Sequence, residues 1–140
     1  IDHLSVFENV SLPLRVAGQS RAHYTQDVTE LLQWVGLGHR MQAFPSTLSG
    51  GEKQLAAIAR AVIAKPNLLI ADEPTGNVDP EIGRRLLRLF AEMNRMGTTV
   101  MIATHDIDLI QELEARVFRI EDGRIYKGLN AAPDFEETYL

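Results

Sequence analysis

Two short segments of the chain combine residue types that could bind a phosphate compound and activate water beside it. In the first, Leu48-Ser49-Gly50-Gly51-Glu52, the serine and the glutamate have the spacing of a helix capping box. Capping does not need the glycine pair, and each glycine costs about 1 kcal/mol of helix stability relative to alanine. The glycines leave backbone N–H groups bare at the positive end of the helix dipole, where a phosphate can approach. We therefore predict an anion site at this helix start.

The second segment places two adjacent carboxylates, Asp72 and Glu73, directly after the apolar run 68–71. Such a run favours a strand covered on both faces, and open α/β sheets bind ligands at the carboxyl ends of their strands. A solvated acidic turn is the alternative, but adjacent carboxylates on a buried strand are costly without a cation. In phosphoryl transfer, Asp72 would hold Mg²⁺ through water and Glu73 would act as general base on the attacking water. The pair predicts nucleotide hydrolysis.

His105 is a third candidate because of the residues expected around it. It follows the predicted strand 98–103, and neighbouring parallel strands would bring it near Asp72 and Glu73. There its ring could hydrogen-bond to a γ-phosphate. A histidine without acidic residues expected nearby is more often a surface residue. That expectation applies to His3, His23 and His39.

Asp79 lies in the segment 76–79, which links the two carboxylates to a helix predicted to begin at Pro80. Proline is accepted in the first turn of a helix, so Asp79 is well placed to cap it. A further role for Asp79 across a subunit interface does not follow from spacing.

The elements that would position these residues change in character along the chain. The first third is predicted to be helical, with one helix at 5–16 that Pro13 kinks or ends, and a second at 21–35 capped by Ser20. Helices and strands then alternate, which implies an α/β fold with a mostly parallel sheet and right-handed crossovers. The predicted helices are 51–64, 80–96 and 107–113, and the predicted strands are 68–71, 98–103, 117–120 and 124–126, the last two joined by a hairpin.

Composition narrows the class of protein. With 140 residues, 45% of them hydrophobic, the chain fits one domain or a large part of one. It has no apolar run long enough to span a bilayer, and nothing at its start predicts a signal peptide. A start at Ile1-Asp2-His3, without a methionine, is what we expect of a chain cut from a longer one. The absence of cysteine excludes disulfides and thiolate zinc sites, and the net charge of −5 argues against a general nucleic-acid binder. A soluble, intracellular protein is expected.

Taken in order, these motifs resemble the nucleotide-binding domain of ATP-binding-cassette (ABC) proteins. Residues 48–52 are similar to the family signature, 68–73 to Walker B with its catalytic glutamate, 76–79 to the D-loop, and His105 to the switch histidine. The resemblance covers essentially the whole chain. It implies a P-loop NTPase-like sheet flanked by helices, with ATP and Mg²⁺ as cofactors.

The resemblance also implies how the chain is divided and paired. Residues 1–140 would be part of one such domain, with a helical subdomain at about 1–48 that docks on a membrane partner, a core part at 49–130, and an acidic, frayed tail at 131–140. In a homodimer, the signature of one subunit would close over the nucleotide held by the other, which makes two composite sites. The residues acting in trans would be Ser49, Gly50, Gly51 and Glu52, those acting in cis Asp72, Glu73 and His105, and Asp79 would lie at the D-loop interface.

Within the family, residues 72–77 have the form found in lipoprotein-releasing, macrolide-exporting and cell-division ATPases, and 88–90, 94–95 and 103–110 are most similar to the cell-division group. That likeness implies ATP hydrolysis in cell division, an integral-membrane permease-like partner, no nucleic acid, and a peripheral place on the cytoplasmic face of the bacterial inner membrane. The alternatives are an exporter ATPase and a non-hydrolysing regulatory or tethering module. A DNA-repair ATPase of the structural-maintenance type would need coiled-coil arms and a basic face.

Several features depart from the family pattern. Lys53 and Leu55 replace the usual glutamine and arginine, and Val78 replaces a leucine. The sequence has no G-x-x-x-x-G-K-S/T phosphate loop. By the resemblance this Walker A loop, the adenine-stacking aromatic residue and the Q-loop glutamine would lie before Ile1. The 140 residues alone are therefore expected to bind ATP very weakly and not to hydrolyse it.

Overall fold

The computed structural model of the protein describes residues 1–76, 78–112 and 115–128, with the backbone alone at 109, 110 and 112. Asn77 in the D-loop-like segment, the end of the predicted helix at 107–113 and the predicted tail at 131–140 lie outside the described residues. The chain divides into two units, Ile1–Thr104 and His105–Leu140.

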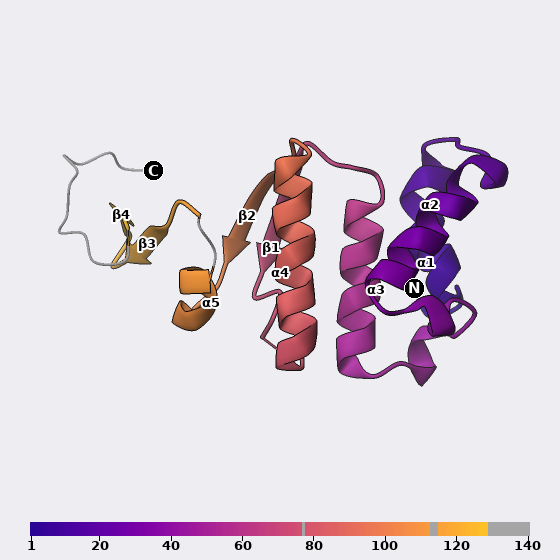
Figure 1. Ribbon diagram of the computed structural model, residues 1–140, viewed down its shortest axis with the longest axis horizontal. Coiled ribbons are helices and arrows are strands. Elements are labelled where there is room, and N and C mark those ends of the chain that lie inside the picture. Colours follow the sequence, from indigo (N-terminus) through magenta and orange to yellow (C-terminus); the bar gives the residue numbers. More distant parts are fainter. Residues whose placement is uncertain (77, 113–114, 129–140) are drawn as a thin grey trace. The chain divides into compact units, whose positions relative to one another are not determined.

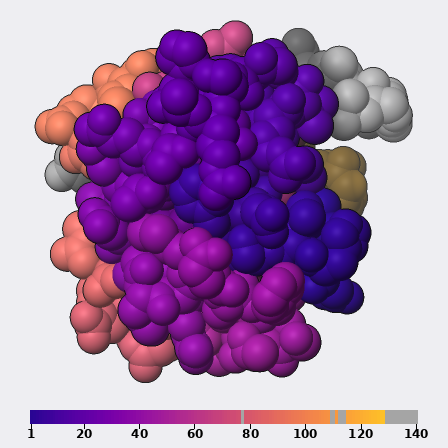
Figure 2. All heavy atoms as spheres, turned by 90° about the vertical axis from the view of Figure 1, so that its right-hand side faces the viewer, coloured from indigo at the N-terminus to yellow at the C-terminus, as the bar shows by residue number. Residues whose placement is uncertain are grey.

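The first unit begins with a helical region, as the sequence predicts. Helix α1 (Val6–Val16) packs against α2 (Arg21–Trp34) and α3 (Gly50–Val62), and the short 3-10 helices η1 (Gly38–Arg40) and η2 (Pro45–Thr47) connect α2 to α3. Seen from the side of these helices, residues of this region make up most of the molecular face (Figure 2). Their fully buried side chains include Val6, Val10, Val28, Leu32, Val35 and Leu37.

Two local predictions in this region need correction. Helix α1 continues past Pro13 to Val16, so the proline does not end the helix, although it removes one internal hydrogen bond. Ser20 precedes α2, but its side chain makes no capping bond; its hydroxyl oxygen lies 2.6 Å from Nδ1 of His23 instead. The histidine ring thus takes the place of the backbone N–H as the partner of this hydroxyl.

A β-α-β unit completes the first unit and confirms the predicted α/β class. Strands β1 (Leu68–Asp72) and β2 (Thr99–Ala103) are parallel, and in their register Asp72 pairs with Ala103. Helix α4 (Pro80–Arg95) connects them and packs against β2 (Figure 1). The apolar side chains that α4 buries are Leu86, Leu87, Leu89, Phe90 and Met93.

One face of this small sheet is open, which corrects the prediction of a strand covered on both sides. Leu69 is buried, but Leu68, Ile70 and Met101 are 52%, 66% and 58% exposed. An apolar run predicts what a strand can bury and says nothing of which segment covers it. Among the described residues of the first unit, no element covers these three side chains.

The second unit contains α5 (Ile107–Glu112) and a hairpin of β3 (Phe118–Glu121) and β4 (Arg124–Lys127). Asp122 and Gly123 have positive φ angles of 48° and 74°, as a two-residue hairpin turn requires. Among the described residues β3 pairs with β4 only, so the parallel sheet has two strands there and not the expected third. No described helix is both long enough and apolar enough to cross a membrane.

Candidate functional site

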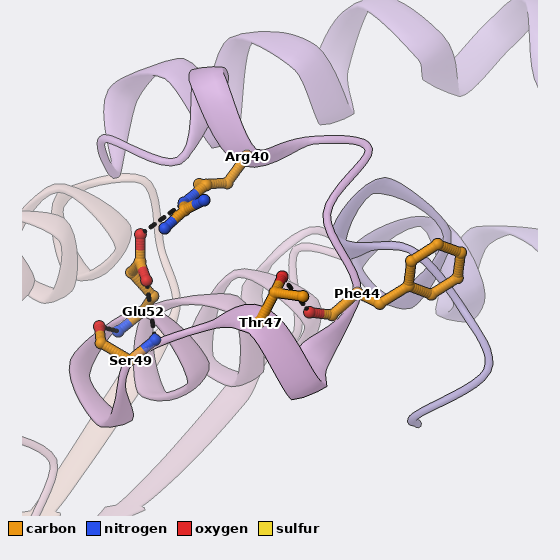
Figure 3. A network of polar contacts seen from close by, with 5 residues as sticks. All are labelled: Arg40, Phe44, Thr47, Ser49 and Glu52. Atoms are coloured by element: carbon orange, nitrogen blue, oxygen red, sulfur yellow. Dashed lines mark hydrogen bonds and ion pairs between the residues drawn. The ribbon is translucent and has the colours of Figure 1, made fainter.

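The start of α3 is held by the predicted capping box. The Ser49 hydroxyl accepts a hydrogen bond from the Glu52 N–H (3.2 Å), and Oε2 of Glu52 accepts one from the Ser49 N–H (2.8 Å). Oε1 of Glu52 accepts a third bond, from Nε of Arg40 at 2.9 Å, which the sequence did not predict (Figure 3). The first turn of α3 is therefore fixed from two sides, by its own cap and by η1.

A second capping box in the same chain shows what capping alone requires. Ser5 and Glu8 make the same reciprocal bonds at the start of α1, but Val6 stands between them with 1% of its surface exposed. In α3 the corresponding position is Gly50, where an added Cβ would meet no atom within 4 Å. At Gly51 the nearest atom would lie at 3.6 Å, an ordinary contact. The packing of the described residues thus requires neither glycine, which leaves the predicted anion site as a reason for the pair.

The Glu52 carboxylate is strongly stabilised in its ionised form. The hydrogen bond from the Ser49 backbone and then the bond from Arg40 lower the pKa of Glu52 to about 2. A negative charge in the first turn of a helix is also favoured by the helix dipole. Glu52 is therefore a permanent charge at neutral pH.

This shift predicts a pH dependence of stability. Since the folded pKa is depressed, the contribution of Glu52 is present above its ordinary pKa of 4.5 and is lost as the pH falls towards 2. We expect the difference in unfolding free energy between the wild type and Glu52→Gln to shrink by about 1 kcal/mol between pH 6 and pH 3. Urea unfolding at both pH values measures it. Glu8→Gln is the matched control, with a smaller change, and an equal change in both variants would contradict the role of Arg40.

The two carboxylates lie at the carboxyl end of β1, as predicted. Asp72 is the last residue of the strand and is exposed, whereas Glu73 is half-buried. The Glu73 N–H donates to the Ala103 carbonyl (2.8 Å), and the Thr104 hydroxyl donates to Oε2 of Glu73 (3.1 Å). Glu73 has a φ of 43°, a left-handed conformation that is strained for a residue with a side chain and clusters at functional sites. The end of β2 thus holds the carboxylate that the sequence assigns as the base.

The residues present fit a magnesium ion that is bound together with a nucleotide. No group of three or more His, Asp or Glu side chains among the described residues could form a metal cage by itself. Mg²⁺ does not need one, because it keeps several waters and takes one or two carboxylates together with substrate phosphates. Asp72, exposed at the end of its strand, could supply such a carboxylate.

The two motifs adjoin within the first unit, although not through their predicted functional groups. Nε2 of Gln54 on α3 donates to the carbonyl of Pro74, just after the carboxylates, at 3.3 Å. An added Cβ at Gly51 would lie 3.8 Å from Val78 and 3.6 Å from Ile82, in the segment that leads into α4 and in its first turn. Figure 1 shows α3 and α4 starting at the end of the unit where β1 and β2 finish.

The two other predicted site residues are Asp79 and His105, and the structure tests only the capping role of Asp79. Asp79 caps α4, since its Oδ1 accepts a hydrogen bond from the Glu81 N–H at 2.8 Å. His105 is exposed and begins the second unit, so its approach to the carboxylates stays a prediction. Sequence reasoning missed Arg40 and Thr104; the strand register could have indicated Thr104, which follows the partner of Asp72.

Comparisons with known proteins agree on one family. The model of the family described as "ABC transporter" matches residues 1–76. The cell division ATP-binding protein FtsE of Escherichia coli (strain K12) is 46% identical over 125 residues, and FtsE of Streptococcus pneumoniae serotype 2 is 43% identical over 123. These alignments cover 89% and 88% of this chain, which spans about half the length of the relatives (56% and 54%).

Two other similar proteins widen the comparison. The methionine import ATP-binding protein MetN of Haemophilus ducreyi is 43% identical over 122 residues, covering 86% of this chain and 36% of the relative. Among solved structures, the dimeric post-hydrolysis state of the ATP-binding cassette MJ0796 with ADP and Pi is similar with a TM-score of 0.80 and 33% identity. That similarity covers 91% of this chain and 58% of the solved one.

Proposed function

The chain belongs to the ABC transporter family, and from that premise we propose that it is part of an ATP-hydrolysing subunit of a cell-division ABC complex. The observation that carries the proposal is Glu73, a carboxylate at the end of a parallel strand whose backbone and side chain are both held by the end of β2. A fixed carboxylate in that place suits a general base for water. Asp72 beside it suits a magnesium ligand when ATP is bound.

The subunit works as a homodimer with two composite ATP sites. Ser49, Gly50 and Gly51 of one subunit bind the phosphates of the ATP held by the other, while Asp72, Glu73 and His105 act on the ATP of their own subunit. The bare helix start of α3 supports the first role. The dimer of the similar solved structure, bound to ADP and Pi, supports the arrangement.

These 140 residues contain no G-x-x-x-x-G-K-S/T phosphate loop, so we expect that they do not hydrolyse ATP by themselves. The similarity to FtsE supports a role in cell division with a membrane partner similar to FtsX, at the cytoplasmic face of the inner membrane. MetN is 43% identical, as is FtsE of Streptococcus pneumoniae, which makes the ATPase subunit of a transporter the second candidate function.

Identifying the membrane protein that binds this subunit tests the proposed function directly. The full-length protein, tagged and purified from membranes in mild detergent, is expected to bring down one FtsX-like integral-membrane protein, and Mg·ATP hydrolysis is expected in the complex. Recovery of a lipoprotein-releasing, macrolide-type or methionine permease instead would replace the cell-division role and keep the ATPase. A complex that binds ATP and never turns it over would favour the regulatory or tethering module.

A further inference from the structure

Glu52 divides its carboxylate between two different elements of the first unit. Oε2 accepts the Ser49 backbone N–H within α3, whereas Oε1 accepts Nε of Arg40, twelve residues earlier at the end of η1. Figure 3 shows the Arg40 side chain directed at this carboxylate. The helical region therefore makes an ionic contact with the turn that carries the glycine pair.

The capping box of α1 again supplies an internal comparison. The pKa of Glu8 is lowered mainly by Ser5, and Arg15 and Arg21 act on it only through their charge. At Glu52 the arginine adds a direct hydrogen bond. A cap does not need that bond, since the Ser5–Glu8 box forms with its serine and glutamate alone.

The charge of Glu52 has a second consequence when a phosphate approaches. A carboxylate in the first turn stabilises the helix, but it also repels an anion arriving at Gly50 and Gly51. A guanidinium on the same carboxylate offsets that repulsion and prevents the side chain from rotating towards the glycines. The contribution of the pair to stability is modest, because part of each side chain, 38% for Arg40 and 19% for Glu52, is exposed to solvent.

We propose that Arg40 is a positioning residue for the phosphate-binding turn: it holds Glu52 in its cap and offsets its charge so that the ATP of the opposite subunit can reach Gly50 and Gly51. The inference rests on the proposed function, because it needs an ATP that arrives from the other half of a dimer. It assigns to η1 a role in closing the composite site.

The test is a double-mutant cycle on ATP-driven dimerisation of the full-length protein. All variants carry Glu73→Gln, so that ATP is not consumed during the measurement. Sedimentation with Mg·ATP then gives the protein concentration at which half of the protein is dimeric. We call this concentration the midpoint and measure it at low and at physiological salt. Arg40→Gln is expected to raise the midpoint about tenfold, the order expected for one unpaired charge near a phosphate, and more at low salt. Adding Glu52→Gln, which keeps the capping bond without the charge, is expected to recover most of this loss.

Two further variants complete the test. Arg40→Lys is expected to recover much of the affinity because it restores the charge. Arg95→Gln, which breaks an ion pair with Glu92 on α4, is the matched control and should leave the midpoint unchanged. An unchanged midpoint in Arg40→Gln, or an increase in the midpoint that Glu52→Gln does not relieve, would overturn the inference alone. A parent protein that never dimerises with ATP would remove the proposed function and the inference together.

Discussion

Replacing Glu73 with glutamine in the full-length protein is expected to lower the ATP turnover rate by about 10²- to 10⁴-fold, the range over which a positioned general base acts. Glutamine has nearly the same shape and keeps an oxygen that can accept the Thr104 hydroxyl, but it cannot take a proton from water. Nucleotide binding should therefore persist while hydrolysis stops. Turnover of ATP under single-turnover conditions, with nucleotide retention measured on the same sample, tests both halves.

Two controls separate the base from its support. Glu92→Gln makes the same chemical change on the exposed surface of α4 and should leave turnover unchanged. Thr104→Val removes the hydroxyl that orients Oε2 of Glu73 and should reduce turnover by less than Glu73→Gln does. Undiminished hydrolysis in Glu73→Gln would remove Glu73 from the role of base.

Local patterns predicted most of the fold because short-range physics decides those elements. The Ser49–Glu52 box, the Asp79 cap and the Asp122-Gly123 hairpin each depend on residues within a few positions of one another, and all three are present. The apolar stripes likewise predicted the helices around the β1–α4–β2 unit. The prediction for Ser20 was wrong because the nearby ring of His23 is a partner that propensities do not include.

The sequence could not predict hydrogen-bond partners that only the packing of separate elements brings together. Arg40 meets Glu52 only because the turn through η1 and η2 brings it over the start of α3, and its distance along the chain matches no motif. Thr104 meets Glu73 across strands that lie thirty-one positions apart. The open face at Leu68, Ile70 and Met101 is a similar case, because burial depends on which elements pack against a strand. Motifs thus predict which side chains take part in the chemistry, but only the structure shows the contacts that hold those side chains in place.

Replacing Gly50 with aspartate should abolish ATP hydrolysis without weakening the fold, a combination that only a ligand-binding role explains. An added Cβ at Gly50 meets no atom within 4 Å, and an acidic residue in the first turn of a helix is favourable by about 0.3 to 1 kcal/mol. The same carboxylate about 4 Å from a phosphate would repel it by about 4 kcal/mol at an effective dielectric constant of about 20. Ala22→Asp, exposed in the first turn of α2, is the matched control for the added charge.

Combining Gly50→Asp with Glu73→Gln in mixed dimers tests whether the two motifs act in different subunits. If each site is composite, placing one substitution in each subunit puts both substitutions in the same site and leaves the other site intact. About half of the activity of each dimer should then remain. Placing both substitutions in one subunit, opposite a wild-type partner, spoils both sites and should leave almost none. The reverse pattern would show that α3 acts on the ATP of its own subunit, because the intact site would then survive only when both substitutions share a chain. Purified heterodimers with two affinity tags, assayed for Mg·ATP hydrolysis, distinguish the two arrangements.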